Sequence, residues 1–126
     1  MKTLTCPIAS IEYYNHDTRR VLLDLPDGES ADFKAGQYLQ LVLPHKKCPF
    51  SIASSPRITS QIELHVRPTP GSEDSVAIEK ALDGATSLTV ELPLGDCFIT
   101  QTPTNPLLLL AASTGVTQMK SIIEFL

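Results

Sequence analysis

The sequence predicts an all-β fold of six antiparallel strands with one short helix and a C-terminal strand-helix tail. Several segments alternate apolar and polar residues with the period of two that is typical of a half-buried strand. Ten prolines, together with Gly, Asn and Asp clusters, separate these segments as turns. Before the tail, a single segment has helical spacing. These observations predict either a small Greek-key barrel or a sandwich.

The first two strands are predicted to form a hairpin. Residues 4–14 and 18–25 carry β-branched and aromatic residues in partial alternation, and Asn15, His16 and Asp17 between them are typical turn residues. The remaining strands are predicted at residues 38–43, 50–54, 61–67 and 87–92. The last of these alternates strictly between apolar and polar residues, as expected of the strand that closes the sheet.

The period changes to that of a helix at residues 74–82. Ser72 stands just before this segment, where a hydroxyl can cap the first turn by accepting a backbone hydrogen bond. Gly84 is the predicted end of the helix, because glycine is the usual residue at a helix C-terminus. One short helix is therefore expected before the last strand.

The tail at residues 101–126 differs in character from the rest. A continuous apolar run at residues 107–110 is typical of a strand buried on both faces of a parallel sheet. The helix after it has an apolar face formed by Val116, Met119, Ile122, Ile123 and Leu126. A monomer offers this face few neighbours, so we expect the tail either to fold back over the sheet or to pair with its counterpart in a homodimer.

Composition excludes several classes of function. The chain has 126 residues, which fits one ordinary domain, and its net charge of -4 without a basic cluster argues against a nucleic-acid surface. The sequence has neither the ~20-residue apolar stretch of a membrane span nor a signal peptide, so a cytoplasmic location is expected. Cys6, Cys48 and Cys97 are far apart and predict neither a disulfide framework nor a metal site.

Two neighbouring motifs carry the most information. Residues 33–39 read Phe-Lys-Ala-Gly-Gln-Tyr-Leu, and residues 48–56 read Cys-Pro-Phe-Ser-Ile-Ala-Ser-Ser-Pro. In this order they resemble the flavin-binding barrel of the ferredoxin reductase superfamily, closest in pattern to the NAD(P)H:flavin reductases. The resemblance favours the barrel over the sandwich. It implies a flavin-binding domain at residues 1–100 and, at residues 101–126, the first strand and helix of an incomplete nicotinamide-binding domain.

The resemblance also implies where a flavin ring would lie. The family serine that lies within hydrogen-bond reach of the hydride-accepting N5 atom corresponds to Ser51, the candidate catalytic residue. Pro49 has no N–H and so suits an exposed strand edge whose backbone reads the ring. His65 lies near the flavin edge or is a half-buried strand residue. The candidate cofactor-binding residues are Tyr38, Pro49, Phe50, Ser51, Ile52, His65, Val66, Arg67, Ser72, Thr114 and Gly115.

The chain departs from the family pattern where phosphate groups would lie. Cys48 stands in place of an arginine, and a thiol cannot make the bidentate contact of guanidinium with phosphate. Glu73 and Asp74 at the start of the helix would repel a phosphate. The basic residues that either supply a point charge instead or are solvated surface are Lys46, Lys47 and Arg67. We therefore expect a loosely bound flavin, with FMN, FAD and riboflavin all open.

The function implied is that of the flavin-binding half of an NAD(P)H-dependent flavin reductase-like oxidoreductase. The complete form would move a hydride from NAD(P)H to flavin and electrons onward to an acceptor protein. Thr114 and Gly115 match the family's nicotinamide turn, but residues 112–115 are explained equally simply as a turn before a helix. We expect the chain alone to lack turnover with NAD(P)H. The alternative is a stand-alone flavin carrier or interaction module without catalysis.

Overall fold

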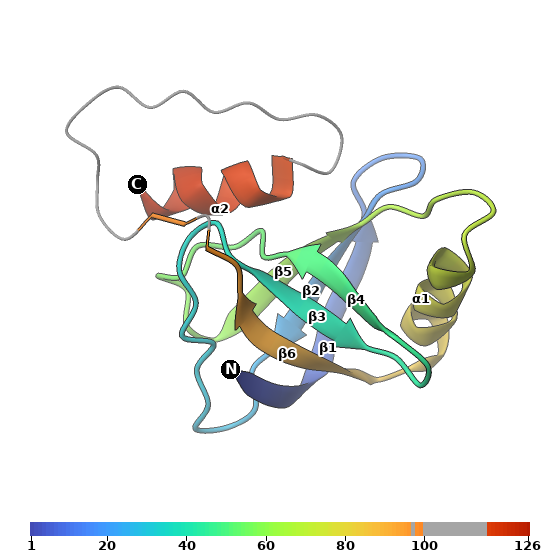
Figure 1. Cartoon of the computed structure of the whole chain (residues 1–126), viewed down its shortest axis with the longest axis horizontal. Helices are drawn as coiled ribbons and strands as arrows, with labels where there is room; N and C mark the ends of the chain where they lie inside the picture. The colour runs from blue at the N-terminus through green and yellow to red at the C-terminus, as the bar shows by residue number, and fades with distance from the viewer. Residues whose placement is uncertain (97, 100–115) are drawn as a thin grey trace.

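The computed structural model describes residues 1–96, 98–99 and 116–126. Six strands and two helices follow one another along this part of the chain (Figure 1). Their bounds are β1 Lys2–Tyr13, β2 Arg19–Asp24, β3 Tyr38–Val42, β4 Lys47–Ser51, β5 Gln61–Val66, α1 Glu73–Gly84, β6 Ser87–Leu94 and α2 Val116–Phe125.

The six strands form one antiparallel sheet in the order β4-β3-β6-β1-β2-β5. The chain leaving β4 then reaches the other end of this order, where the Ala53 N–H donates to the Glu63 carbonyl of β5 at 2.8 Å. This contact brings the two edges together, so the sheet curves into a barrel (Figure 1). The predicted all-β barrel is confirmed: its two end strands meet at this contact, just beyond Ser51, while β4 itself keeps an open edge.

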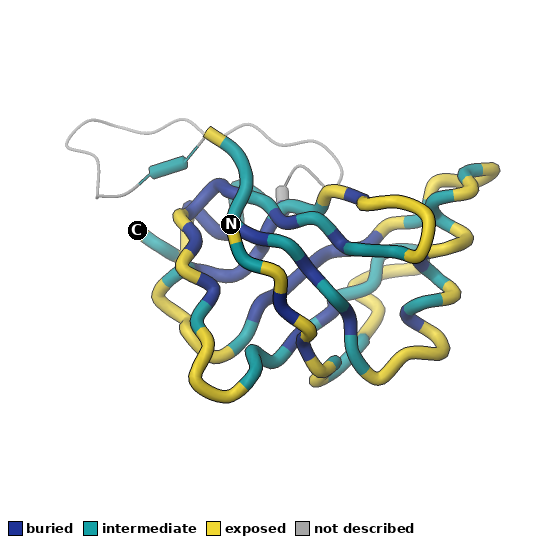
Figure 2. The backbone as a smooth tube through the Cα atoms, turned by 60° about the horizontal axis from the view of Figure 1, so that its bottom comes forward, coloured by how far each residue is buried: buried dark blue, intermediate teal, exposed yellow. Residues whose placement is uncertain are grey.

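The barrel interior is filled by the apolar residues that alternate along each strand. In β6, for example, Leu88, Val90 and Leu92 are buried while their neighbours are less so. Along the tube of Figure 2, buried residues alternate in the same way with more exposed ones. The side chains that are almost fully buried include Val21, Leu23, Leu39, Leu41, Ile52, Ile62, Leu64, Val90 and Leu92. Burying such side chains is worth about 1.5–3 kcal/mol each, and this term holds the barrel together.

The hairpin of β1 and β2 turns where the sequence predicts. Asn15 begins the turn, and its Oδ1 accepts hydrogen bonds from the backbone N–H groups of Asp17 and Thr18 at 3.1 and 2.9 Å. A short polar side chain that satisfies its own backbone in this way favours a turn over a continued strand. The hairpin turn is therefore confirmed.

Strand β4 differs from its predicted bounds. It covers Lys47–Ser51, whereas the sequence predicts residues 50–54. The shift has a physical cause in the partners of the next residues: the Ile52 N–H donates to the Gln37 carbonyl, outside the ladder between β3 and β4, and Ala53 pairs with β5. The hairpin itself sets the start of β4, because the Leu43 N–H donates to the Lys46 carbonyl at 2.8 Å.

Helix α1 begins as predicted. The Ser72 hydroxyl caps it by accepting a hydrogen bond from the Ser75 N–H at 3.3 Å. Gly84 is the last helical residue, and Ala85 caps the C-terminus in an extended conformation. The helix lies beside the barrel, on a different side from α2 (Figure 1).

Helix α2 packs on the barrel with only part of the predicted apolar face. Thr117 and Ser121 are buried, whereas Ile123 and Leu126 are exposed; of the predicted apolar face, Ile122 is buried. The prediction was wrong for Ile123 and Leu126, because the barrel offers hydrogen-bonding groups that bring Thr117 and Ser121 inward instead. The Ser121 hydroxyl, for example, donates to the Ser54 carbonyl at 2.7 Å. The strand predicted at residues 107–110 lies outside the described residues.

Candidate functional site

The ladder between β3 and β4 brings two of the predicted site residues together. Tyr38 and Ser51 are direct partners in its register. Ser51 is half-buried, and its hydroxyl makes no hydrogen bond with any residue in the described part of the chain. A hydroxyl that is partly shielded from water and has no protein partner is available to a ligand.

Three neighbours of Ser51 contribute in different ways. Pro49 is exposed on β4, which stands at one end of the hydrogen-bonded order, so its missing N–H leaves no orphaned donor. Phe50 is half-buried and packs against the core. Ile52 has no exposed surface, so only its backbone can face a ligand. The side chains nearest to the exposed edge are therefore those of Pro49, Phe50 and Ser51.

Gly95 sets the position of the Tyr38 ring. A Cβ at Gly95 would lie 3.0 Å from Tyr38 Cδ1, tighter than most real Cβ contacts, so the tyrosine ring would have to shift. Gly95 also has φ +104°, a conformation that glycine adopts without strain. The glycine thus permits both the turn after β6 and the close approach of the tyrosine ring.

We expect Gly95→Ala to lower the free energy of unfolding by about 1–3 kcal/mol, because a side chain at positive φ is strained and the Tyr38 ring must move. Urea denaturation measures the loss. Gly84→Ala is the matched control, since a Cβ there meets nothing within 4 Å and Gly84 has no positive φ. Equal stability of the two variants would contradict the assigned role of Gly95.

The end of β5 carries three more predicted site residues. Val66 is buried, and Arg67 Nε lies 3.1 Å from Asp17 Oδ2. Both ring nitrogens of His65 have partners: Nε2 lies 2.6 Å from Glu63 Oε2, and Nδ1 lies 3.2 Å from Thr117 Oγ1. His65 is buried in this arrangement, and a contact between its side chain and flavin stays a prediction.

Glu63 is the centre of a buried polar cluster that the sequence does not predict. Its Oε2 also accepts a hydrogen bond from the Tyr14 hydroxyl at 3.0 Å. Its Oε1 lies 3.2 Å from the Arg20 guanidinium and 3.3 Å from Lys120 Nζ of α2. Together with the contact to His65, these interactions join β1, β2, β5 and α2 around one carboxylate.

The cluster keeps Glu63 ionised. Burial by itself would raise the pKa of the carboxyl group, but hydrogen bonds from His65, Tyr14 and Arg20 and the charge of Lys120 outweigh it. The net effect lowers the Glu63 pKa from 4.5 to about 2. The exposed fraction of its side chain is only 5%, so these partners are largely shielded from water.

The chain was compared with known proteins. Residues 5–99 match the oxidoreductase FAD-binding domain family. The chain belongs to this family.

Two curated relatives are longer proteins, and this FAD-binding domain matches only part of their length. An NAD(P)H-flavin reductase of Vibrio harveyi is 34% identical over 97% of this chain and 53% of its own length. A CDP-6-deoxy-L-threo-D-glycero-4-hexulose-3-dehydrase reductase of Yersinia pestis is also 34% identical, over 99% of this chain and 38% of its own. The chain thus spans about half the length of these relatives or less.

Solved structures show the same fold. The cytochrome P450 reductase of Amycolatopsis superposes with a TM-score of 0.82 at 30% identity, covering 97% of this chain and 38% of that one. Phthalate dioxygenase reductase has a TM-score of 0.73 at 22% identity, covering 97% and 39%. These likenesses agree with the FAD-binding domain family shown by residues 5–99.

The predicted flavin-ring residues offer uncharged groups, namely the Ser51 hydroxyl and the exposed edge of β4. Contact of these groups with a flavin ring stays a prediction. Cys48, in the position of the family arginine, is buried, and burial first, then the charge of Asp74, raises the pKa of its thiol. The thiol therefore stays neutral, and it has no positive charge to offer a phosphate.

The three cations that the sequence offers as substitutes all have carboxylate partners. Lys46 pairs with Asp74 at 2.7 Å and Lys47 with Glu91 at 2.9 Å. Arg67 pairs with Asp17. A phosphate would have to compete with these carboxylates.

The remaining predicted site residues lie apart from Ser51 along the chain. The Ser72 hydroxyl caps α1, so it already has a hydrogen-bond partner before any ligand binds. Thr114 and Gly115 lie outside the described residues. Among residues 1–96, 98–99 and 116–126, no group of three or more His, Cys, Asp and Glu side chains could hold a metal ion.

Sequence reasoning missed Glu63, Tyr14, Arg20 and Lys120, and of this cluster it named only His65. The signal was the alternation in β5, where Glu63 and His65 share the face opposite to Ile62, Leu64 and Val66. Two ionisable residues on an outer face usually point to solvent, and here α2 covers them.

In the described part of the chain, no helix is long and apolar enough to cross a membrane.

Proposed function

We propose that this FAD-binding domain is the flavin half of an NAD(P)H-dependent flavin reductase-like oxidoreductase. In the complete protein, hydride passes from NAD(P)H to flavin, and electrons then pass to an acceptor protein. Support comes from relatives whose names identify them as an NAD(P)H-flavin reductase and as a reductase component of terephthalate 1,2-dioxygenase. The division proposed is a flavin barrel at residues 1–100 and the opening strand and helix of a nicotinamide domain at residues 101–126.

The half-buried Ser51 hydroxyl carries the proposal. It has no hydrogen-bond partner in the described part of the chain and lies beside Tyr38 on an exposed strand edge. A flavin, when bound, supplies a ring that accepts hydride at N5. Ser51 would donate or accept a hydrogen bond at that atom and leave the opposite ring face open to a nicotinamide. Tyr38, Pro49, Phe50 and Ile52 would hold the ring edge through side chains and backbone.

The outer part of the proposed site includes His65, Val66, Arg67 and Ser72, with Thr114 and Gly115 near the nicotinamide. We expect His65 to support the proposed site through its contacts with Glu63 and Thr117, because both of its ring nitrogens already contact these side chains. Weak binding is expected, since Lys46, Lys47 and Arg67 all have carboxylate partners.

A second function is a flavin carrier that binds without catalysing hydride transfer. The two functions share the flavin site and differ in whether NAD(P)H is oxidised.

Titration of riboflavin, FMN and FAD, followed by flavin fluorescence, tests the site. We expect saturable binding that Ser51→Ala weakens about threefold to tenfold, the usual worth of one hydrogen bond. Ser10→Ala, which removes a half-buried strand hydroxyl on β1, is the matched control and should leave the affinity unchanged. Absence of binding by any flavin would refute the site.

Oxidation of NADH in the same samples separates the two functions. No turnover by the chain, with flavin bound, is expected of the flavin half of a two-domain enzyme and of a carrier alike. Turnover gained on adding the remaining half of a full-length relative would favour the enzyme over the carrier. A cytoplasmic location and a homodimer formed through the tail stay predictions, and light scattering tests the dimer.

A further inference from the structure

Helix α2 lies across the end of the barrel at which β3 begins and β4 ends (Figure 1). Its Gln118 Nε2 donates to the Gly36 carbonyl at 2.9 Å, in the turn that leads into β3. Gly36 is buried, so water cannot readily replace this donor. Tyr38, the first residue of β3, follows two residues later. Gln118 therefore anchors the segment from which the Tyr38 side chain projects.

The same helix also anchors the segment that follows β4. The Ser121 hydroxyl donates to the Ser54 carbonyl at 2.7 Å, and Ser121 has no exposed surface. The Ser54 hydroxyl in turn accepts a hydrogen bond from the Glu63 N–H at 3.1 Å, so this segment is fixed from two sides. Ser51, the last residue of β4, lies three residues earlier. Helix α2 therefore bridges β3 and β4 just outside the pair of residues that ends their ladder.

Between these two anchors the main chain is itself hydrogen-bonded. The Ile52 N–H donates to the Gln37 carbonyl at 3.2 Å, one step beyond the pair of Tyr38 and Ser51. The Gln37 side chain is buried, and its Nε2 donates to the Gly95 carbonyl at 3.0 Å. A displacement of either anchored segment would therefore move Tyr38 relative to Ser51.

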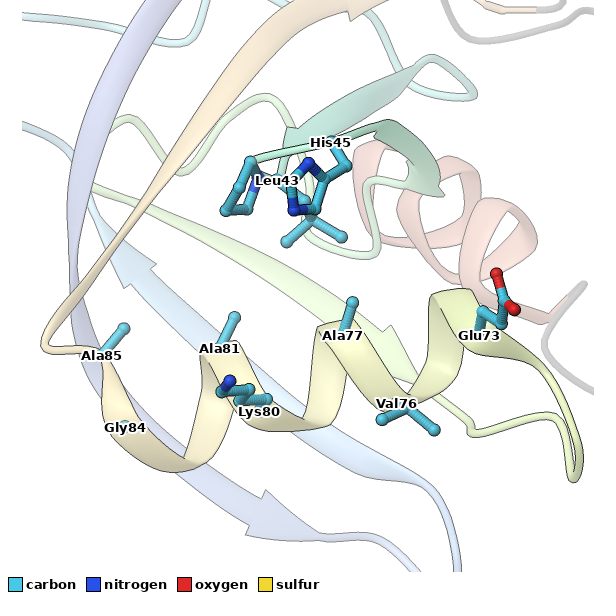
Figure 3. A pocket seen from close by; sticks show the side chains of 10 residues that line it. Leu43, His45, Glu73, Val76, Ala77, Lys80, Ala81, Gly84 and Ala85 are labelled. Atoms are coloured by element: carbon cyan, nitrogen blue, oxygen red, sulfur yellow. The ribbon is translucent and has the colours of Figure 1, made fainter.

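The opposite end of the β3–β4 ladder is held more loosely. A pocket of about 550 Å³ separates α1 from the turn that joins these strands, and Leu43 of the turn faces Ala77 of the helix across it (Figure 3). Lys46 and Asp74 form an ion pair between the turn and the helix at 2.7 Å, but both side chains are exposed. Ion pairs that are open to water contribute little stability. The end that α2 bridges is therefore the more firmly held.

We propose that Gln118 and Ser121 are positioning residues of the proposed flavin site, an inference that rests on the proposed function. They act through the main chain, by fixing the spacing of the Tyr38 side chain and the Ser51 hydroxyl before a flavin binds. Groups that are held in place in this way bind a ligand at a smaller cost in conformational entropy. The family match ends at residue 99, so a helix outside the matched residues completes the flavin site.

Gln118→Met tests the first anchor, because methionine keeps the length of the side chain and removes the donor to Gly36. We expect riboflavin, FMN and FAD to bind about threefold to tenfold more weakly, measured by flavin fluorescence in the 126-residue chain. Gln61→Met is the matched control. It removes a comparable amide hydrogen bond, from Gln61 Nε2 to Asp24 Oδ1 at 2.9 Å, at the start of β5, and should leave the affinities unchanged.

A double variant separates positioning from a general loss of stability. If Gln118 acts by holding the ring edge, its effect depends on Ser51, so the fold losses of Gln118→Met and Ser51→Ala should not multiply when the two are combined. A purely structural role of Gln118 predicts that they do multiply. Ser121→Ala tests the second anchor and should show the same pattern. Thermal melting confirms that each variant is folded, and Gln118, which is only half-buried, is the safer of the two sites to change.

Unchanged flavin affinity in Gln118→Met, or a double variant in which the losses multiply, would overturn the positioning role and leave the proposed function standing. Equal weakening by Gln61→Met would also overturn it, because the effect would then not be specific to the end that α2 bridges. Absence of binding by every flavin in the wild-type chain would overturn both this inference and the proposed function.

Discussion

Glu63→Gln is expected to lower the free energy of unfolding by about 3 kcal/mol. The substitution keeps the size of the side chain but removes the charge that Arg20 and Lys120 face at 3.2 and 3.3 Å. It also weakens the contact with His65 Nε2, at 2.6 Å the shortest that Glu63 makes. Breaking a buried ion pair from one side costs about 3–5 kcal/mol, and the partly exposed cations place this case at the lower end.

Helix α2 should respond most strongly to this change. Lys120 and Thr117 are its links to the Glu63 cluster, so amide hydrogen exchange in α2 is expected to speed up more than in the barrel strands. Glu12→Gln, at an exposed carboxylate on β1, is the matched control and should change stability by less than about 0.5 kcal/mol. Equal losses in the two variants would show that the buried cluster is not a special source of stability.

The same carboxylate predicts how stability depends on pH. Glu63 has a pKa of about 2 in the folded chain and 4.5 as its ordinary value, so the unfolded chain binds the proton more readily. The stabilisation is therefore complete above about pH 4.5 and is lost as the pH falls towards 2. A shift of this size corresponds to about 3 kcal/mol.

Urea denaturation at a series of pH values between 7 and 2 measures this loss. The wild-type chain should lose stability steeply below pH 4.5, and Glu63→Gln, which has no carboxyl group to protonate there, should show a shallower dependence. Parallel curves for the two proteins would contradict the low pKa. Glu12→Gln is again the control, and its stability should depend on pH as steeply as that of the wild-type chain.

The Glu63 cluster lies next to the segment that follows Ser51, so it links the stability of the fold with the candidate site. The Glu63 N–H donates to the Ser54 hydroxyl at 3.1 Å, and its carbonyl accepts from Ala53 at 2.8 Å. Both partners lie just beyond Ser51 along the chain. The residue that holds α2 therefore also holds the segment that leaves the proposed flavin strand, so we expect Glu63→Gln to weaken flavin binding as well.

Local sequence patterns were sufficient for the strands and turns, whereas the choice of a barrel over a sandwich came from the family resemblance. Alternation in β6 gives the buried set Leu88, Val90 and Leu92, because strand side chains project to opposite faces. Asn15 predicts the first turn and Ser72 the start of α1, because each side chain satisfies backbone groups within a few residues. Each of these signals lies within a short stretch of the chain, so the strand, the turn and the helix cap could be predicted without the tertiary structure.

The sequence by itself thus determined the number and order of the strands, the first turn, the helix cap and the family motif around Ser51, but not the bounds of β4. Only the tertiary structure decided which face of α2 meets the barrel, why Glu63 and His65 are buried, and that Lys46 and Asp74 form an ion pair across 28 residues. The physical reason is that burial of a polar side chain depends on partners far away in the sequence. Thr117 and Ser121 pack inward because acceptors on the barrel satisfy them, and no periodicity within α2 records those acceptors.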